Sequence, residues 1–330
     1  MPQAPEATVV IPTHDRWDLL STAALPSALG QKEIDLEVVV VDDGSNDHTS
    51  ERLGRLRDLR LRVIRHERPR GVAQARNAGI NIASGEWIAF LDDDDLWAPN
   101  KLRLQIDTAR AARAGFVYAA SAALDDRRQF LYSLELADPD RLATQLFRKN
   151  VIWAGSSNVV ARADLVREVD GFDERLFQLA DWDLWIRLAL SGPAAACPEI
   201  LVGCVIQPRS MLLTDRRDVF REMDYLVEKH RDEATRLGVD FEPALFSRWV
   251  AEGHLRAGRR LRAAATYLES ARRDRDPEAL PRALASLLGE SALLTIKRLL
   301  LGRNAPSEAR DVAEPSWLAS WREQSPFLLE

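Results

Sequence analysis

The chain of 330 residues is long enough for two domains, and its hydrophobic fraction of 46% can bury a sizeable core. A formal net charge of −6 argues against a protein that binds nucleic acid through a basic surface. Two cysteines are too few for a disulfide framework, and the N-terminal residues do not resemble a secretion signal. The low cysteine content indicates a reducing, cytoplasmic setting. No apolar run approaches the ~20 residues of a membrane-spanning helix, so we expect a soluble protein with, at most, peripheral membrane contact.

The first half of the chain alternates short apolar runs with segments of helical periodicity. The pattern predicts strands at 8–12, 36–41, 60–67 and 87–91, and helices at 17–29, 49–58, 72–83 and 100–113. Because the strands are continuous apolar runs, they are typical of a sheet covered by helices on both faces. We therefore expect an α/β fold with a mixed, mostly parallel sheet.

The second half changes character near residue 213. Up to that point we expect strands at 114–124, 151–161 and 199–207, the second with a bend of small residues, and a helix at 182–191. From 215 to 303 the sequence is rich in Arg, Ala, Leu and Glu and predicts helices only, including a helix–turn–helix pair at 248–274. The predicted domains are 1–213 and 214–303, followed by a partly ordered tail at 304–330. Trp317 and Trp321 in this tail favour a docked helix.

Polar residues follow three of the predicted strands, and such strand ends form ligand sites in parallel sheets. Thr13-His14-Asp15 follows the first strand, Asp42-Asp43-Gly44 the second, and Asp92 to Asp95 the fourth. We expect these groups to converge. A simple turn is the alternative for Asp42-Asp43, and a solvated acidic loop is the alternative for the four aspartates.

The four aspartates divide by position. In an extended chain Asp92 and Asp94 point the same way and would repel, unless a hard cation such as Mg²⁺ or Mn²⁺ neutralises them. Asp93 should then point away as a solvated neighbour, and Asp95 should support the turn that follows. Arg76 lies among small residues and suits phosphate oxygens, although a solvated helix face is the simpler interpretation.

Four motifs in order resemble the inverting family 2 glycosyltransferases of the GT-A fold. They are "VVIPTHDR", "VVVVDDGSNDHT", "RGVAQARNAGINIASGEWIAFLDDDDLWAPNKL" and "NVVARADLVREVDGFDERLFQLADWDLWIRLALSG". The resemblance covers roughly residues 8–210 and implies a nucleoside-diphosphate sugar donor, a hydroxyl acceptor and Mn²⁺ or Mg²⁺.

The resemblance also assigns roles by position. Asp181 corresponds to the catalytic base, Asp94 and Asp92 to the metal-binding pair, and Arg76 to a residue near the diphosphate. Together with Arg76, the expected nucleotide-sugar site consists of Pro12, Thr13, Asp15, Asp42, Asp43, Asp92 and Asp93, so Asp92 has both roles.

Two departures from the family pattern affect these roles. The residue before the base is often acidic in the family and is Ala180 here, and the His expected after the last strand is replaced by a segment that contains Arg209. A plain helix N-cap is the alternative for Asp181. The alternatives for the whole protein are a catalytically degenerate binding or scaffold protein and, less well supported, an aspartyl-phosphate phosphatase that uses Asp92 as nucleophile.

The helical domain has two interpretations. It can be a packing extension that shapes the acceptor site or a homodimer interface. Alternatively, leucines and basic residues at 283–303 favour peripheral contact with a membrane that carries a lipid-linked acceptor.

Overall fold

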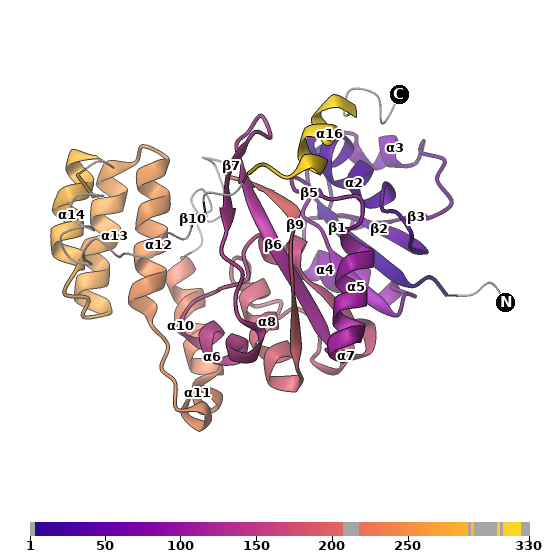
Figure 1. The fold of residues 1–330 in the computed structure, drawn as a ribbon. Helices are drawn as coiled ribbons and strands as arrows, with labels where there is room; N and C mark the ends of the chain where they lie inside the picture. The colour runs from indigo at the N-terminus through magenta and orange to yellow at the C-terminus, as the bar shows by residue number, and fades with distance from the viewer. Residues whose placement is uncertain (1–3, 207–217, 290–291, 294–308, 311–312, 325–330) are drawn as a thin grey trace. The chain divides into compact units, whose positions relative to one another are not determined.

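The structure is a computed structural model that describes residues 4–206, 218–289, 292–293, 309–310 and 313–324 (Figure 1). The chain forms two compact units. The first contains residues 1–143, 151–206 and 309–330, and the second contains 144–150 and 207–308. Each unit is described by itself.

The first unit is built on one mixed sheet with the strand order β10-β7-β6-β8-β4-β1-β2-β3, and β9 pairs with both β6 and β5. The strands β4, β1, β2 and β3 run parallel, which confirms the expected α/β class. The strands are β1 (Ala7–Thr13), β2 (Leu36–Asp42), β3 (Leu61–Arg65), β4 (Trp87–Phe90), β5 (Leu96–Trp97), β6 (Phe116–Leu124), β7 (Phe130–Leu134), β8 (Val160–Arg162), β9 (Ala194–Val205) and β10 (Ala309–Arg310).

Helices cover both faces of this sheet (Figure 1). Val9 and Ile11 of β1 face α2 and α5, whereas Val10 contacts α4, where Gly79 leaves room for the valine side chain. This alternation explains why the strands are apolar at every position. The helices are α1 (Trp17–Leu19), a π-helix (Leu20–Ala24), α2 (Leu25–Leu29), α3 (Thr49–Leu53), α4 (Val72–Ile82), α5 (Lys101–Ala112), α7 (Ala163–Glu168), α8 (Ala180–Ser191) and α16 (Ser316–Gln324). Helix α6 (Leu142–Arg148) belongs mostly to the second unit.

The segment 151–161 differs from the predicted strand. The chain forms a 3₁₀ turn at Gly155–Asn158, and only Val160–Arg162 pairs as β8. Ala154 and Gly155 have positive φ angles of 61° and 47°, which break an extended chain. The Asn158 amide then takes the place of strand pairing, because it accepts from the Ala119 N–H (2.6 Å) and donates to the Ala119 carbonyl (2.8 Å).

Sheet register determines where the polar strand ends meet. Thr13 lies opposite Asp42, and Asp42 lies opposite Arg65. On the other side of β1, Val10 lies opposite Phe90, two residues before Asp92. Parallel pairing thus brings the ends of β1, β2 and β4 to one edge of the sheet.

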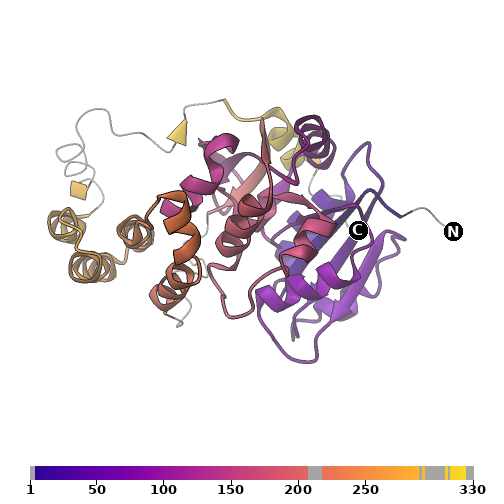
Figure 2. The same cartoon turned by 90° about the horizontal axis from the view of Figure 1, so that it is seen from below.

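The second unit is helical throughout its described part and confirms the expected helical region. Its helices are α10 (Val219–Lys229), α11 (Arg231–Leu237), α12 (Pro243–Arg256), α13 (Arg260–Arg273) and α14 (Ala279–Leu288). Helices α12, α13 and α14 lie side by side in sequence order, and Figure 2 looks almost along their axes. They bury mainly small side chains around Tyr267. No helix in the described ranges is both long and apolar enough to span a membrane.

The tail returns to the first unit, where it forms the helix expected from its tryptophans. In α16, Leu318 is fully buried against Leu96 and Leu124, and the Trp317 indole N–H donates to the Ile200 carbonyl (2.8 Å). The tail helix is therefore part of the sheet domain's core.

Candidate active site

The four aspartates form a turn rather than an extended segment. The Asp95 N–H donates to the Asp92 carbonyl (3.2 Å), which reverses the chain after β4. The prediction that Asp93 is a solvated neighbour was therefore wrong, because it assumed extended geometry. The Asp93 side chain is only 5% exposed, accepts from the Thr13 hydroxyl (2.8 Å) and pairs with Arg16 (2.9 Å). Burial raises the pKa of Asp93 to about 7.

Arg16 is a site residue that the sequence analysis missed. Its guanidinium bridges two of the aspartates, since a second nitrogen lies 2.6 Å from the Asp94 carboxylate. Arg16 lies three residues after the end of β1. Asp93 lies three residues after the end of β4, which is the parallel neighbour of β1. The arginine in the "THDR" segment was the available signal, but its partner depends on the turn.

Asp92 is held from the opposite side by α4. Its carboxylate accepts from Arg76 (2.6 Å), and the Arg76 guanidinium lies 5.1 Å from the ring centre of Phe172. Arg76 is buried, so the alternative of a solvated helix face was wrong. The cation–π contact and the ion pair fix this arginine at the strand end.

Ser157 organises the base of the turn. Its hydroxyl accepts from the Asp92 N–H (3.0 Å), and its carbonyl accepts from the Trp97 indole (2.7 Å). Asp95 is buried and accepts from the Val205 N–H (3.1 Å), in keeping with the supporting role expected for it. Burial raises the pKa of Asp95 well above its usual range. Ser157 lies in the small-residue bend of 151–161, whose function the pattern did not indicate.

Asp181 lies in the first turn of α8 rather than at its N-cap. The helix begins at Ala180 after Leu179, and the Asp181 carboxylate accepts from the Trp182 N–H (2.7 Å), so the plain N-cap interpretation was wrong. Burial raises the pKa of Asp181 to about 6, while Arg76 opposes the rise and Asp92 adds to it. Asp181 is therefore electrostatically coupled to the Arg76–Asp92 pair.

Gly155 makes room for this carboxylate. A Cβ atom at Gly155 would lie 2.8 Å from the Asp181 Oδ2. The sequence offered only a small residue in a bend, and the contact across 26 positions could not be read from it. The neighbouring acid of α8, Asp183, is fully buried and paired with Arg187 (2.6 Å), so it has a structural partner of its own.

The two aspartates at the end of β2 are held by backbone N–H groups and by an arginine. Asp42 is fully buried and accepts from the Ser45 N–H (2.8 Å) and from Arg65 (2.6 Å). Asp43 accepts from the N–H groups of Arg70 (2.9 Å) and Gly71 (2.8 Å), which positions the loop that leads into α4.

The first strand supplies the remaining expected residues. Pro12 is buried within β1 opposite Val41, and Thr13 contacts Asp93 as described above. Asp15 has a positive φ of 52°, and its N–H donates to the Ser45 hydroxyl (2.9 Å), which ties this loop to the segment after β2. The structure thus places all three strand ends together.

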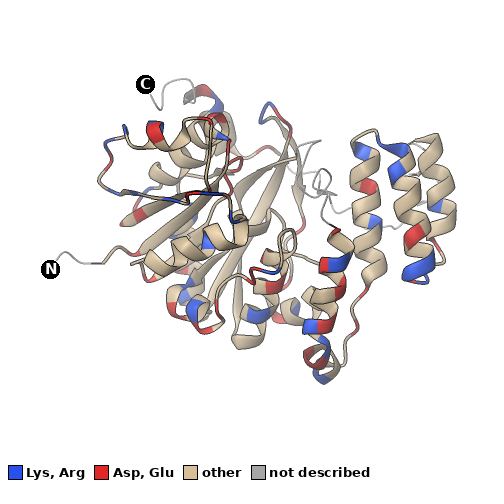
Figure 3. Cartoon of the chain, turned by 180° about the vertical axis from the view of Figure 1, so that it is seen from behind, with Lys and Arg blue, Asp and Glu red and all other residues tan. Residues whose placement is uncertain are grey.

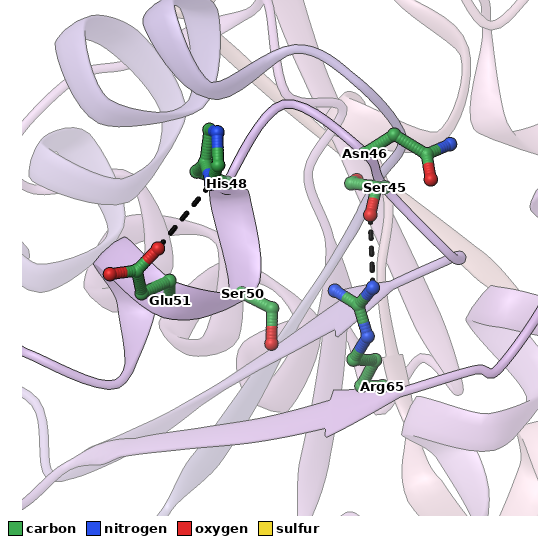
Figure 4. A pocket seen from close by; sticks show the side chains of 6 residues that line it. All are labelled: Ser45, Asn46, His48, Ser50, Glu51 and Arg65. Atoms are coloured by element: carbon green, nitrogen blue, oxygen red, sulfur yellow. Dashed lines mark hydrogen bonds and ion pairs between the residues drawn. The ribbon is translucent and has the colours of Figure 1, made fainter.

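A polar hollow of about 450 Å³ lies beside Arg65 and the loop that follows β2 (Figure 4). Arg65 connects the hollow to Asp42, and it also donates to the Ser45 carbonyl (3.0 Å). None of the lining residues belongs to the aspartate turn, so the hollow is separate from that turn. The lining residues are Ser45, Asn46, His48, Ser50, Glu51 and Arg65.

The donor set fits a hard divalent cation that shares its ligands with a substrate. The side chains of Asp92 and Asp94 are 33% and 20% exposed, which leaves carboxylate oxygens within reach. Mg²⁺ is typically bound by one or two carboxylates together with phosphate oxygens and water. Within the described residues no group of three His, Cys, Asp or Glu side chains could hold a metal alone. The expected substitute Arg209 lies outside the described residues.

Comparisons with known proteins identify a family for the sheet domain. Residues 8–169 match the profile of "Glycosyl transferase family 2". The succinoglycan biosynthesis protein ExoO of Rhizobium meliloti is 36% identical over 208 residues, which are 60% of each chain. The Escherichia coli protein WfgD, named as a UDP-Glc:alpha-D-GlcNAc-diphosphoundecaprenol beta-1,3-glucosyltransferase, is 35% identical over 34% of this chain and 44% of its own. The chain therefore spans about 60% or less of the length of these two relatives.

Among solved structures, residues 1–349 of S. aureus TarS in complex with UDP have a similar fold. The TM-score is 0.53 at 20% identity, and the match covers 93% of this chain and 94% of that one. The mixed sheet with flanking helices is accordingly a GT-A fold. With the motifs in order and a matching profile, residues 8–169 form a domain of glycosyl transferase family 2.

Proposed function

We propose that the protein is a metal-dependent, inverting glycosyltransferase that moves a sugar from a nucleoside diphosphate to an acceptor hydroxyl. The observation that carries this proposal is the position of Asp181. Its carboxylate is half-buried beside Gly155 and is coupled electrostatically to the Arg76–Asp92 pair. A base with a pKa of about 6 is largely ionised at neutral pH and can accept a proton.

In this mechanism the donor nucleotide binds along the ends of β1 and β2. Pro12, Thr13 and Asp15 line the first strand end, and Asp42 and Asp43 shape the second. Arg76 faces the diphosphate, as its position beside Asp92 allows. Arg16 and Thr13 hold Asp93, which keeps the turn in one conformation and presents Asp92 and Asp94.

Asp181 removes the proton of the acceptor hydroxyl. The hydroxyl oxygen attacks the anomeric carbon from the face opposite the leaving group. Asp92 and Asp94 are the residues that would hold Mg²⁺ or Mn²⁺. When bound, the cation supplies charge neutralisation for the departing nucleoside diphosphate. Arg76 adds a second positive charge on the same side.

The relatives' names suggest the class of acceptor. ExoO is named for succinoglycan biosynthesis, and WfgD for a diphosphoundecaprenol-linked sugar. We infer a role in polysaccharide or glycoconjugate synthesis with a lipid-linked acceptor and peripheral contact with the membrane. The segment 283–303 expected for that contact lies partly outside the described residues. A homodimer through the helical domain is the alternative use of this region.

A substitution at the proposed base tests the function. Asp181→Asn should lower the rate of sugar transfer by about 10²–10⁴-fold, because a positioned base contributes that much. The donor is found first by thermal shift with UDP-, GDP-, TDP- and CDP-sugars and Mn²⁺. Nucleotide release then reports turnover, and calorimetry reports binding, which should stay near the wild-type value.

The control is Asp107→Asn, which removes an exposed carboxylate of α5. Full turnover in Asp181→Asn would contradict the assignment of the base. Donor binding without sugar transfer or donor hydrolysis in the wild type would favour the degenerate binding protein.

Ala180 is buried in α8, so the residue that replaces the family's acid at this position packs in the core. Family membership favours the transferase over the phosphatase.

A further inference from the structure

Helix α14 has its small residues inside and its large apolar residues outside. Its buried positions are mainly Ala and Ser, and they pack toward the core around Tyr267. Its exposed positions are all leucine. They occur at intervals of four, three and one residues, which places them on one side of the helix. These residues are Leu280, Leu284, Leu287 and Leu288.

Helix α13, which packs beside α14, exposes two further leucines. Leu261 and Leu268 are exposed and seven residues apart, so they share one side of α13. The start of α13 lies beside the end of α14, because the Arg260 guanidinium is 3.2 Å from the position of a Cβ at Gly289. We name the six leucines, which are 43 to 78% exposed, the leucine face. Clusters of exposed large apolar residues of this kind mark interaction sites.

The surroundings of the leucine face are basic although the whole chain is acidic. Residues 243–289 contain nine arginines against five acidic residues, in a chain with a formal net charge of −6. Within α14 the only charged residue is Arg282, which is buried and paired with Glu278 (2.7 Å). Helix α14 therefore shows almost no charge (Figure 3). The exposed Arg260 and Arg262 lie in the first turn of α13.

We propose that the leucine face docks this protein onto the surface of an anionic lipid bilayer, with Arg260 and Arg262 at the headgroups. Leucines that enter the acyl boundary beside arginines that meet anionic headgroups are the pattern of an interfacial helix. A second copy of the chain fits less well, because pairing two leucine faces would bring their flanking arginines together. The inference deepens the proposed function, on which it rests for the lipid-linked acceptor.

Vesicle co-sedimentation of the full chain tests the docking surface. Vesicles of phosphatidylcholine are compared with vesicles that also contain phosphatidylglycerol, at low and high salt. The wild type should bind the anionic vesicles, and each of Arg260→Gln and Arg262→Gln should weaken partitioning about fivefold. The combined change of Leu284→Gln and Leu288→Gln should weaken it by about tenfold or more.

Matched controls come from the first unit. Leu59→Gln alters a fully exposed leucine, and Arg113→Gln alters an exposed arginine at the end of α5. Both should bind vesicles like the wild type. Circular dichroism on heating checks that the leucine variant is folded, as expected for substitutions at exposed positions.

Three results would overturn the proposal. They are no vesicle binding by the wild type, equal binding by the folded leucine variant, and a wild-type dimer in light scattering that the leucine variant dissociates. Donor binding by calorimetry separates this inference from the proposed function. If the donor binds and vesicles do not, only the docking surface fails. If vesicles bind and no sugar nucleotide does, the transferase assignment fails.

Discussion

Asp181 is a carboxylate whose surroundings set the pH at which it can act as a base. Burial raises its pKa to about 6, with Asp92 adding to the rise and Arg76 opposing it. The base form grows as pH increases through this value. We therefore expect kcat/KM to rise between about pH 5 and 7 and to level off above, because only the ionised carboxylate accepts a proton.

Steady-state rates measured across this range with a saturating metal concentration give the profile. The residual activity of Asp181→Asn should lack the rising limb. A limb that persists in this variant would assign the titration to another group.

The close contact between Gly155 and Asp181 leads to a prediction for catalysis. Gly155→Ala places a Cβ 2.8 Å from the Asp181 carboxylate and strains a backbone with a φ of 47°. The carboxylate must move, and a displacement of about 1 Å can cost about 10²-fold in rate. We expect kcat to fall by that order while calorimetric donor affinity is kept. The control is Gly192→Ala, at the other end of α8, where no atom lies within 4 Å of the added Cβ.

At this scale the sequence predicted which acids are present but could not predict their partners. Asp92 and Asp181 were identified as site residues from motifs, and the structure couples them through Arg76. The predicted orientation of Asp93 was wrong, because a tight turn replaces the extended chain after β4. Gly155 is a partner over a long sequence separation, which no local pattern contains.

Helix α5 contains an unusual buried group at its first position. Lys101 is fully buried against the ring of Trp97, with its Nζ 3.9 Å from the ring centre, and within the described structure this nitrogen has no hydrogen-bond partner. Burial lowers the pKa of Lys101 well below its usual value. In the unfolded chain this lysine has a pKa of ~10.4. As pH falls below that value, the unfolded chain gains a proton that the folded chain does not, so the free energy of unfolding decreases.

Lys101→Met should therefore stabilise the protein. Methionine keeps the length of the side chain and removes a buried donor that costs about 1–3 kcal/mol when unsatisfied. Urea unfolding at pH 7 and pH 9 should show a higher midpoint for the variant, with the larger gain at pH 7. Lys32→Met, at an exposed position, is the control. A lower midpoint for Lys101→Met would mean that the amine stabilises the fold.

Elements were predictable where one physical signal dominated. The four-valine strand β2 and the helix α4 appear close to their expected bounds. The segment 151–161 is apolar enough for a strand, but Ala154 and Gly155 turn the backbone and the Asn158 side chain takes over the pairing with β6. Side-chain hydrogen bonds of this kind compete with regular structure and are specified by tertiary context.

For the whole molecule, the tail helix packs against residues from the middle of the sheet domain's sequence. Leu318 is buried with Leu96, which directly follows the aspartate turn. Leu318→Ala should lower the free energy of unfolding by about 2–5 kcal/mol. Urea unfolding measures the loss, and Leu59→Ala, at a fully exposed position, should leave the midpoint unchanged. An unchanged midpoint for Leu318→Ala would show that α16 is not part of the domain's core.

The course of the chain has a consequence for how the two units can vary. The sheet domain resumes at residue 309 after the chain has left it at 206, so most of the helical unit is an insertion tethered at both ends. The entropy of closing a loop grows only with the logarithm of its length, about 0.6 kcal/mol per doubling. Lengthening or shortening the insertion should therefore change the stability of the sheet domain little. A shortened chain that stops before residue 309, by contrast, removes α16 and uncovers Leu96 and Leu124.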